Sequence, residues 1–168
     1  MKRSWRLVLA GGVVAGTLDI VYACVFWAIK RGVAPQRVLQ RVASGLLGEA
    51  SLTGGWATAA LGLVSHYFIA ISMAVTYYLV ARRWSVLWER PVPYGAAYGL
   101  LLYGIMNHVV VPRSAAGPSS KDALWIAMSI VVHMFLIGVP CAMFARLAVL
   151  ADLRTSALEG NPPRRLDV

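Results

Sequence analysis

Long apolar segments, separated by shorter polar ones, dominate the chain. They cover about residues 7–29, 56–81, 92–112 and 123–148. Each is long enough to cross a hydrocarbon core of about 30 Å as an α-helix, which rises about 1.5 Å per residue. Asp19 is the only Asp, Glu, Lys or Arg inside the first segment, and residues 56–81, 92–112 and 123–145 contain none. The pattern predicts an all-α polytopic membrane protein, an antiparallel bundle of four transmembrane helices.

A different pattern fills the connection between the first two spans, at about residues 35–48. One face would hold Val38, Leu39, Val42, Ala43, Leu46 and Leu47, and the other Gln36, Arg37, Gln40, Arg41 and Ser44. The segment is too short to span a membrane, so we expect an amphipathic helix in the interface plane, covering the bundle. A segment that dips into the bundle is the alternative, and it is less favoured because it would bury arginines.

The two ends of the chain differ in character, an apolar run near the N-terminus and a polar C-terminal segment. MKRSWR before an apolar run is typical of a secretory signal, but this run is long, contains Asp19 and lacks a convincing cleavage site. It is therefore predicted to be the first span. Residues 1–150 are expected to form a single transmembrane domain. Residues 151–168, which end in EGNPPRRLDV, are expected to be a disordered cytoplasmic tail.

Composition and charge agree with this organisation. The chain is 59% hydrophobic and only 14% charged, unlike an average soluble domain. Its net charge of +9 comes from Lys and Arg at the ends of the apolar segments, where they suit lipid headgroups. No basic patch is interleaved with exposed aromatic residues on a soluble face, so the lipid bilayer and not nucleic acid is the expected partner. The side that holds both termini has more Lys and Arg, which favours the cytoplasm for that side. Cys24 and Cys141 are expected near opposite membrane faces and so not in a disulfide.

Small residues mark the predicted contact faces of the helices. Gly12 and Gly16 share a face with Asp19, Gly62 shares one with His66, and Ala97 and Gly104 share one with His108. Glycines at such spacing let helices approach closely. Gly12, Gly16, Gly62 and Gly104 are therefore the predicted packing positions. Pro140 is expected to kink the fourth helix, because it leaves the Leu136 carbonyl without its usual partner.

The ionisable groups on these faces form the candidate site. A charge in the membrane costs a few kcal/mol or more, so such groups are expected to face one another inside the bundle. Asp19, His66 and His133 fall at a similar depth, toward the extracytoplasmic half. The predicted polar cluster comprises Asp19, His66, Asn107, His108 and His133.

Several interpretations of this cluster stay open. It could handle ions or protons, since histidine titrates near physiological pH, and this is the favoured interpretation. Asp19, His66 and His133 are also candidate ligands for a divalent metal such as zinc or iron. A purely structural role, fixing helix register, is the main alternative. A b-type haem held by His66 and His133 is a further one. An enzyme is less expected, because Ser65 and Ser129 lack a nucleophile-elbow context.

The chain also resembles a family of small bacterial inner-membrane proteins that includes the YagU-like group. The segments that carry the resemblance are GTLDIVYA, RVLQRVASGLLG, GGWATAALGLVSHYFIA, YGLLLYGIMNHVVVPRSA and VVHMFLIGVP. The resemblance implies a four-helix, multi-pass protein of the bacterial inner membrane and gives weight to the five cluster residues. It implies no activity, and the arginine-rich termini depart from the pattern. Four helices are few for a monomeric transporter, so a homo-oligomer is one expectation.

Overall fold

The computed structural model describes residues 3–117 and 120–158, and within these residues it contains helices and no strand. Four helical stretches are long and apolar enough to cross a membrane, as the sequence predicted. The first is α1 (Arg3–Arg31) and the second is α3 (Gly55–Ala81). The third joins α5 (Pro91–Ile105), the π-helix η2 (Met106–Val110) and α6 (Val111–Arg113). The fourth joins α7 (Ala123–Val132), the π-helix η3 (His133–Gly138) and α8 (Val139–Leu158).

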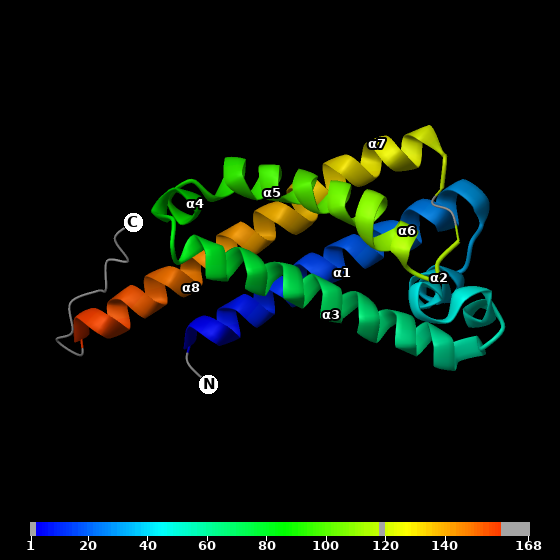
Figure 1. Cartoon of the computed structure of the whole chain (residues 1–168), viewed down its shortest axis with the longest axis horizontal. Coiled ribbons are helices and arrows are strands. Elements are labelled where there is room, and N and C mark those ends of the chain that lie inside the picture. The colour runs from blue at the N-terminus through cyan, green and yellow to red at the C-terminus, as the bar shows by residue number, and fades with distance from the viewer. Residues whose placement is uncertain (1–2, 118–119, 159–168) are drawn as a thin grey trace.

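The four stretches run along the long axis of the molecule, and successive connections lie at alternate ends (Figure 1). The short helix α4 (Ser85–Glu89) lies at one end. At the other end lies α2 (Pro35–Leu47), followed by the 3-10 helix η1 (Gly48–Leu52). α1 packs against both α3 and α8, while α5 packs against η3 and α8. α3 and α8 also pack against each other, so α1, α3 and α8 are in mutual contact.

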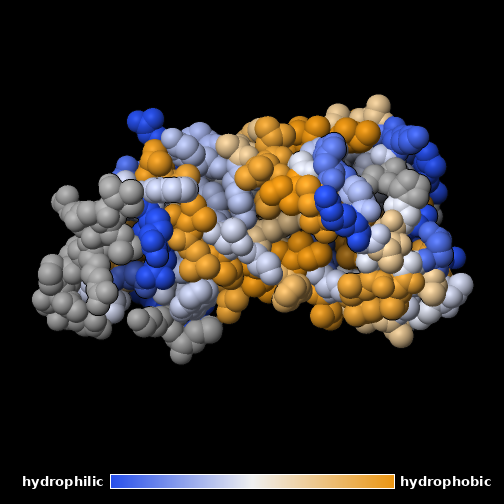
Figure 2. All heavy atoms as spheres, in the orientation of Figure 1, coloured by the Kyte–Doolittle hydropathy of each residue, from blue (hydrophilic) through white to orange (hydrophobic). Residues whose placement is uncertain are grey.

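The outer surface is apolar across its middle. Figure 2 shows hydrophobic residues over the central part of the visible face and hydrophilic residues gathered toward both ends. Val21, Phe68, Leu101 and Phe135, one from each long stretch, are all exposed. Contiguous exposed apolar surface on this scale is foreign to a water-soluble monomer. The surface therefore suits contact with lipid.

The end of the molecule near α4 is closely packed. Its core includes Val8, Ala74 and Cys141 from three different long helices. Three tyrosine hydroxyls add bonds between elements. Tyr78 Oη donates to Asp152 Oδ2 at 2.5 Å, Tyr77 Oη to the Leu87 carbonyl at 2.9 Å, and Tyr98 Oη to the Met73 carbonyl at 2.9 Å. The Tyr98 bond ties α5 directly to α3 at this end.

The predicted packing glycines have different surroundings. A Cβ on Gly12 would lie 2.6 Å from Ile71 Cα, and one on Gly16 would lie 3.0 Å from Ala70 Cβ, so both positions let α1 approach α3. Gly62 also makes a close approach, but to the Leu39 carbonyl of α2 and not to another span. Gly104 is not a packing position, because a Cβ there would have no neighbour within 4 Å.

The close contact of the third span lies on another face from the predicted one. Cβ atoms on Gly95 and Gly99 would collide with backbone of η3 and α8, and one on Gly138 would collide with α5. All three glycines are buried, whereas Ala97, on the predicted face, is exposed. Gly95 and Gly99 are four residues apart, the spacing of the Gly-x-x-x-Gly motif that brings membrane helices together. That motif is the signal that identifies the true face.

The bounds of the connecting helix α2 agree with the prediction, but its buried face differs from the predicted one. α2 spans Pro35–Leu47, close to the predicted helix at 35–48. Val38 and Ala43 are buried as expected, but so are Gln40 and Ser44 from the predicted polar face. Packing of α2 on α3 explains this, since Gln40 Nε2 donates to the Gly55 carbonyl of α3 at 3.0 Å.

α8 continues through Leu158, where a disordered tail was predicted from residue 151. The bond from Tyr78 to Asp152 gives this added helix a tertiary contact, which a reading of composition could not include. The rest of the predicted tail, residues 159–168, lies outside the described residues. The spanning stretch Ala123–Leu158 is accordingly longer than the predicted one.

The ends of α1 and α7 are joined near α2. Lys30 Nζ donates to Asp122 Oδ1 at 2.5 Å, and the same carboxylate accepts the backbone N–H of Trp125 at 3.0 Å as the N-cap of α7. The Lys30 hydrogen bond, followed by the Trp125 N–H, lowers the pKa of Asp122 from its ordinary value. Asp122 is therefore charged at neutral pH, where a carboxylate also favours the positive end of a helix dipole.

Candidate functional site

A cavity of about 820 Å³ lies toward the α2 end of the molecule, between all four spanning stretches. Most of its lining is apolar, with residues such as Ile20, Ile69 and Ile137. α2 covers one side through Val38, Val42 and Leu46. A largely apolar cavity of this size with few polar groups has the usual character of a small-molecule site.

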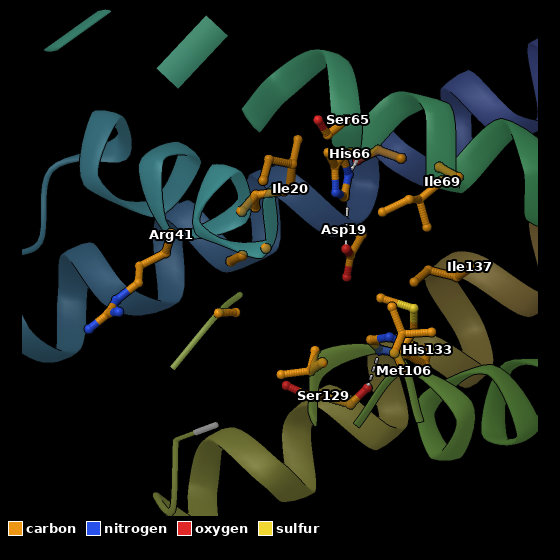
Figure 3. Close-up of a pocket in the computed structure, with 18 of the residues that line it drawn as sticks. Asp19, Ile20, Arg41, Ser65, His66, Ile69, Met106, Ser129, His133 and Ile137 are labelled. Atoms are coloured by element: carbon orange, nitrogen blue, oxygen red, sulfur yellow. Dashed lines mark hydrogen bonds and ion pairs between the residues drawn. The ribbon is translucent and has the colours of Figure 1, made fainter. Parts of the chain in front are cut away.

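Asp19 projects into this cavity from α1 (Figure 3). Its Oδ2 atom lies 4.0 Å from Nε2 of His66 on α3, and the two side chains are 22% and 13% exposed. Asp19 has no hydrogen-bond partner among the described residues, because 4.0 Å is beyond hydrogen-bond reach. Its carboxylate is therefore available to a ligand or a proton. This arrangement brings together the first two residues of the predicted cluster.

His66 has one ring nitrogen already engaged. Its Nε2 lies 2.8 Å from the backbone carbonyl oxygen of Gly16 on α1. A carbonyl oxygen only accepts, so Nε2 carries the hydrogen and donates it to Gly16. In the neutral imidazole the other nitrogen, Nδ1, is then an acceptor. Gly16 serves the site twice, since its missing side chain admits α3 and its carbonyl orients His66.

His133 comes from the opposite side of the cavity, on η3 (Figure 3). Its Nδ1 lies 2.9 Å from the Ser129 carbonyl one turn earlier, and so donates to it. Nε2 is then the acceptor nitrogen of the neutral ring. The ring packs edge-on against Tyr103, with 5.4 Å between ring centroids. Figure 3 shows the Asp19 carboxylate between the imidazoles of His66 and His133.

Of the two remaining predicted cluster residues, Asn107 and His108, only Asn107 lies at the cavity. Asn107 lines the cavity, and its Nδ2 donates to the Tyr103 carbonyl of the preceding turn at 3.0 Å. His108 does not belong to the cluster. It is exposed, it is absent from the cavity lining, and its Nδ1 bonds the Gly104 carbonyl of its own helix at 3.0 Å. The face of Gly104 and His108 points outward because α5 packs through Gly95 and Gly99 instead.

Ser129, Tyr103 and Tyr22 are polar residues at or beside the site that the sequence reading did not assign to it. Ser129 lines the cavity at 5% exposure, and its Oγ has no hydrogen-bond partner among the described residues. The buried hydroxyl of Tyr22 lies beside it, and neither hydroxyl has a described partner that meets hydrogen-bond geometry. An unpaired buried hydroxyl is costly unless something else satisfies it. The one-turn spacing of Ser129 and His133 was the available signal for Ser129.

Two π-helical segments carry cluster residues and each precedes a proline. In η3 the Val139 N–H donates to the Met134 carbonyl, and in η2 the Val111 N–H donates to that of Met106. Pro140 and Pro112 follow these segments and lack the N–H that an α-helix would use. The irregularity predicted at Pro140 thus takes the form of a π-helix, a feature often found at functional sites.

The contacts of these side chains bear on the metal and haem centres that the sequence suggested. Within residues 3–117 and 120–158 no group of three His, Cys, Asp or Glu side chains could hold a metal ion. The acceptor nitrogens that could ligate are Nδ1 of His66 and Nε2 of His133, because the other nitrogen of each ring donates to a backbone carbonyl. The described side chains thus form no three-ligand metal centre in this arrangement. Cys24 and Cys141 are free thiols, as expected.

Comparison of the chain with protein-family models, with curated proteins and with solved structures finds no match. The resemblance to the YagU-like family therefore remains a prediction.

Proposed function

We propose that this chain is a multi-pass protein of the bacterial inner membrane that binds and releases a proton at the Asp19–His66–His133 cluster. In this proposal the four spans form an antiparallel bundle with both termini in the cytoplasm, and α2 lies in the interface plane. The apolar middle of the outer surface supports a location in the membrane (Figure 2). In Figure 1, α2 is seen almost end-on while the spans run along the picture, which supports a position of α2 in the interface plane.

A single observation carries the proton proposal. The Asp19 carboxylate faces the cavity with no hydrogen-bond partner in the described part of the chain, and His66 Nε2 lies 4.0 Å from it. A proton added to His66 would create an ion pair with Asp19, and a proton added to Asp19 would remove an unpaired buried charge. Both changes relieve the cost of an isolated carboxylate in an apolar setting. Histidine titrates in the physiological range, so such a site can exchange protons.

Infrared difference spectroscopy of the protein in lipid nanodiscs tests the proposal. Spectra recorded between about pH 5 and about pH 8 should show carboxyl and imidazole bands that change together. Asp19→Asn and His66→Gln should each remove these bands. His108→Gln is the matched control, since His108 is exposed and outside the cavity. Spectra of both cluster variants that equal the parent spectrum would reject the proposal.

A structural role is the second candidate, and the 2.8 Å bond from His66 to the Gly16 carbonyl favours it. This bond crosses from α3 to α1 and fixes their register, a contribution of about 0.6–2 kcal/mol between membrane helices. If this role is the whole function, His66→Gln should lower the unfolding temperature without any protonation band being present in the parent protein.

A further inference from the structure

The cavity opens sideways, toward the surface that lipid would cover. Val64 and Phe68 of α3 line it and are 68% and 72% exposed, and Val110 of η2 lines it at 40% exposed. These three side chains form a rim between the second and third spans. The Tyr98 hydroxyl of α5 donates to the carbonyl of Met73 on α3, at the side of the cavity nearer α4. A molecule dissolved in the hydrocarbon can therefore reach the cavity between α3 and η2.

The polar groups at the base of the cavity are mainly hydrogen-bond acceptors. Asp19 presents a carboxylate, and the neutral imidazoles of His66 and His133 have each given their N–H to a backbone carbonyl. Their remaining nitrogens accept. The hydroxyls of Ser129 and Tyr103 can donate or accept a hydrogen bond. A base rich in acceptors and bearing one carboxylate is complementary to a positively charged ligand and opposes an anion.

The ligand must also be larger than a metal ion. No three ligating side chains among the described residues gather around one point, whereas the cavity measures about 820 Å³. Aromatic side chains contribute to the wall, and a cation next to such rings gains further attraction. They are Trp27, Phe68, Tyr103 and Trp125. An apolar body with a delocalised or tertiary positive charge matches this wall and its base.

The charged groups around Asp19 leave room for an added cation. From α3 it faces His66, and from η3 it faces His133. From α5 the nearest titratable side chain is Tyr103, and the cavity residues of α7 and η2 do not titrate. Arg41 of α2 reaches the lining, but its guanidinium points away and pairs with Glu49 at 3.2 Å (Figure 3). The Tyr67 hydroxyl is bonded to Thr17.

We infer that the cavity binds a lipophilic organic cation, which enters from the bilayer between α3 and η2 and displaces the proton from the Asp19–His66–His133 cluster. The inference rests on the proposed proton function and names what is exchanged. The charge balances, because one cation binds beside the Asp19 carboxylate as one proton leaves the cluster for water. The ion pair that Asp19 makes with protonated His66 is replaced by one with the ligand.

Tetraphenylphosphonium and tetraphenylborate provide matched probes, since they are similar in size and hydrophobicity and opposite in charge. With the purified protein in nanodiscs, tetraphenylphosphonium should bind saturably and release about one proton per bound cation into weakly buffered solution. Linkage to one proton makes the affinity rise by up to about tenfold per pH unit while the cluster is protonated. Tetraphenylborate should not bind saturably.

Variants locate the binding. Asp19→Asn should weaken tetraphenylphosphonium binding at least about tenfold, while Asp19→Glu, which keeps the charge, should retain it. His108→Gln should bind like the parent. Equal binding by Asp19→Asn, binding without proton release, or equal saturable binding of both probes would each overturn the inference. If Asp19→Asn does not fold, proton release and the comparison of the two probes with the parent protein and Asp19→Glu still decide the inference.

The infrared experiment separates the two proposals. Protonation bands that depend on Asp19 and His66, together with no saturable cation binding, would leave the proton function standing and overturn the cation inference. Absence of those bands would reject the proton function itself. Neutral and cationic lipids can also be compared as competitors of tetraphenylphosphonium. If both displace it equally, the site recognises apolar chains and not charge, and the inference is overturned.

Discussion

Gly99 and Gly104 of the third span have opposite surroundings, although only one turn and a half of helix separates them. Gly99 is buried where a Cβ would collide with the His133 carbonyl, whereas Gly104 faces open space. The backbone of η3 can approach α5 only because Gly99 has no side chain. Since His133 is the residue in contact, the position of its imidazole in the cavity depends on this approach.

Substitution of these glycines tests the packing. Gly99→Ala should destabilise the protein by about 1–3 kcal/mol, because the added methyl group overpacks a backbone contact. Gly104→Ala adds the same methyl group without a neighbour within 4 Å, and alanine is the better helix former. Its unfolding midpoint should equal or exceed that of the parent. Thermal or denaturant unfolding in detergent micelles makes the comparison. Equal losses for the two variants would contradict the assigned contact face.

The same residues show what the sequence could predict at this scale. Asp19 and His66 were correctly placed on inward faces, because each shares a helix stripe with small residues, and His133 was grouped with them by its similar depth. His108 was not, because Ala97 and Gly104 suggested a contact face while Gly95 and Gly99 form the real one. Helical spacing identifies candidate faces. It does not decide between two small-residue stripes on one helix, which depends on the partner helix.

At the scale of elements, α2 is a cover held on α3. Its Gln40 is 2% exposed and donates to the Gly55 carbonyl at 3.0 Å and to Thr58 Oγ1 at 3.3 Å. The adjoining face of α2 lines the cavity through Val38 and Val42. The bounds of α2 were predictable from Pro35 and the apolar spacing. The burial of Gln40 was not, since it depends on where the start of α3 lies.

Loosening α2 should make the cavity more accessible from water. We expect Gln40→Ala to raise the rate at which a cysteine at Val42→Cys reacts with a membrane-impermeant maleimide, by about fivefold if one net hydrogen bond of about 1 kcal/mol is lost. Gln36→Ala, on the same helix and half-buried, serves as the control. The rate is measured above the background of the two native cysteines. An unchanged rate in Gln40→Ala would show that this bond does not hold the cover.

Among the elements, the π-helical segments were the least predictable from the sequence. Pro140 signalled an irregularity, but not that the turn carrying His133 would widen. Pro112 was read only as the end of a span, yet η2 before it carries Asn107. A proline removes one donor, and several local rearrangements can satisfy the freed carbonyl. The choice among them depends on neighbouring helices such as α5, which packs against η3.

At the scale of the molecule, one end is closed and the other holds the cavity. Near α4, tyrosine hydroxyl bonds and a core of small residues hold α1, α3, α5 and α8 together. Near α2, the cavity occupies the space between the spans. In the proposed function, the proton would be exchanged with water at the α2 end. The excess of Lys and Arg at the α4 end predicts that the α2 end faces away from the cytoplasm.

Cysteine labelling of intact and lysed cells determines this face. Ser85 and Ser120 are both exposed and lie in connections at opposite ends of the molecule, so Ser85→Cys and Ser120→Cys form a matched and conservative pair. With the positive charge excess in the cytoplasm, a membrane-impermeant maleimide should label Ser120→Cys in intact spheroplasts and Ser85→Cys only after lysis. The reverse result would turn the cavity toward the cytoplasm. The α2 cover would then separate the cluster from cytoplasmic water, and the proton released on cation binding would appear inside the cell.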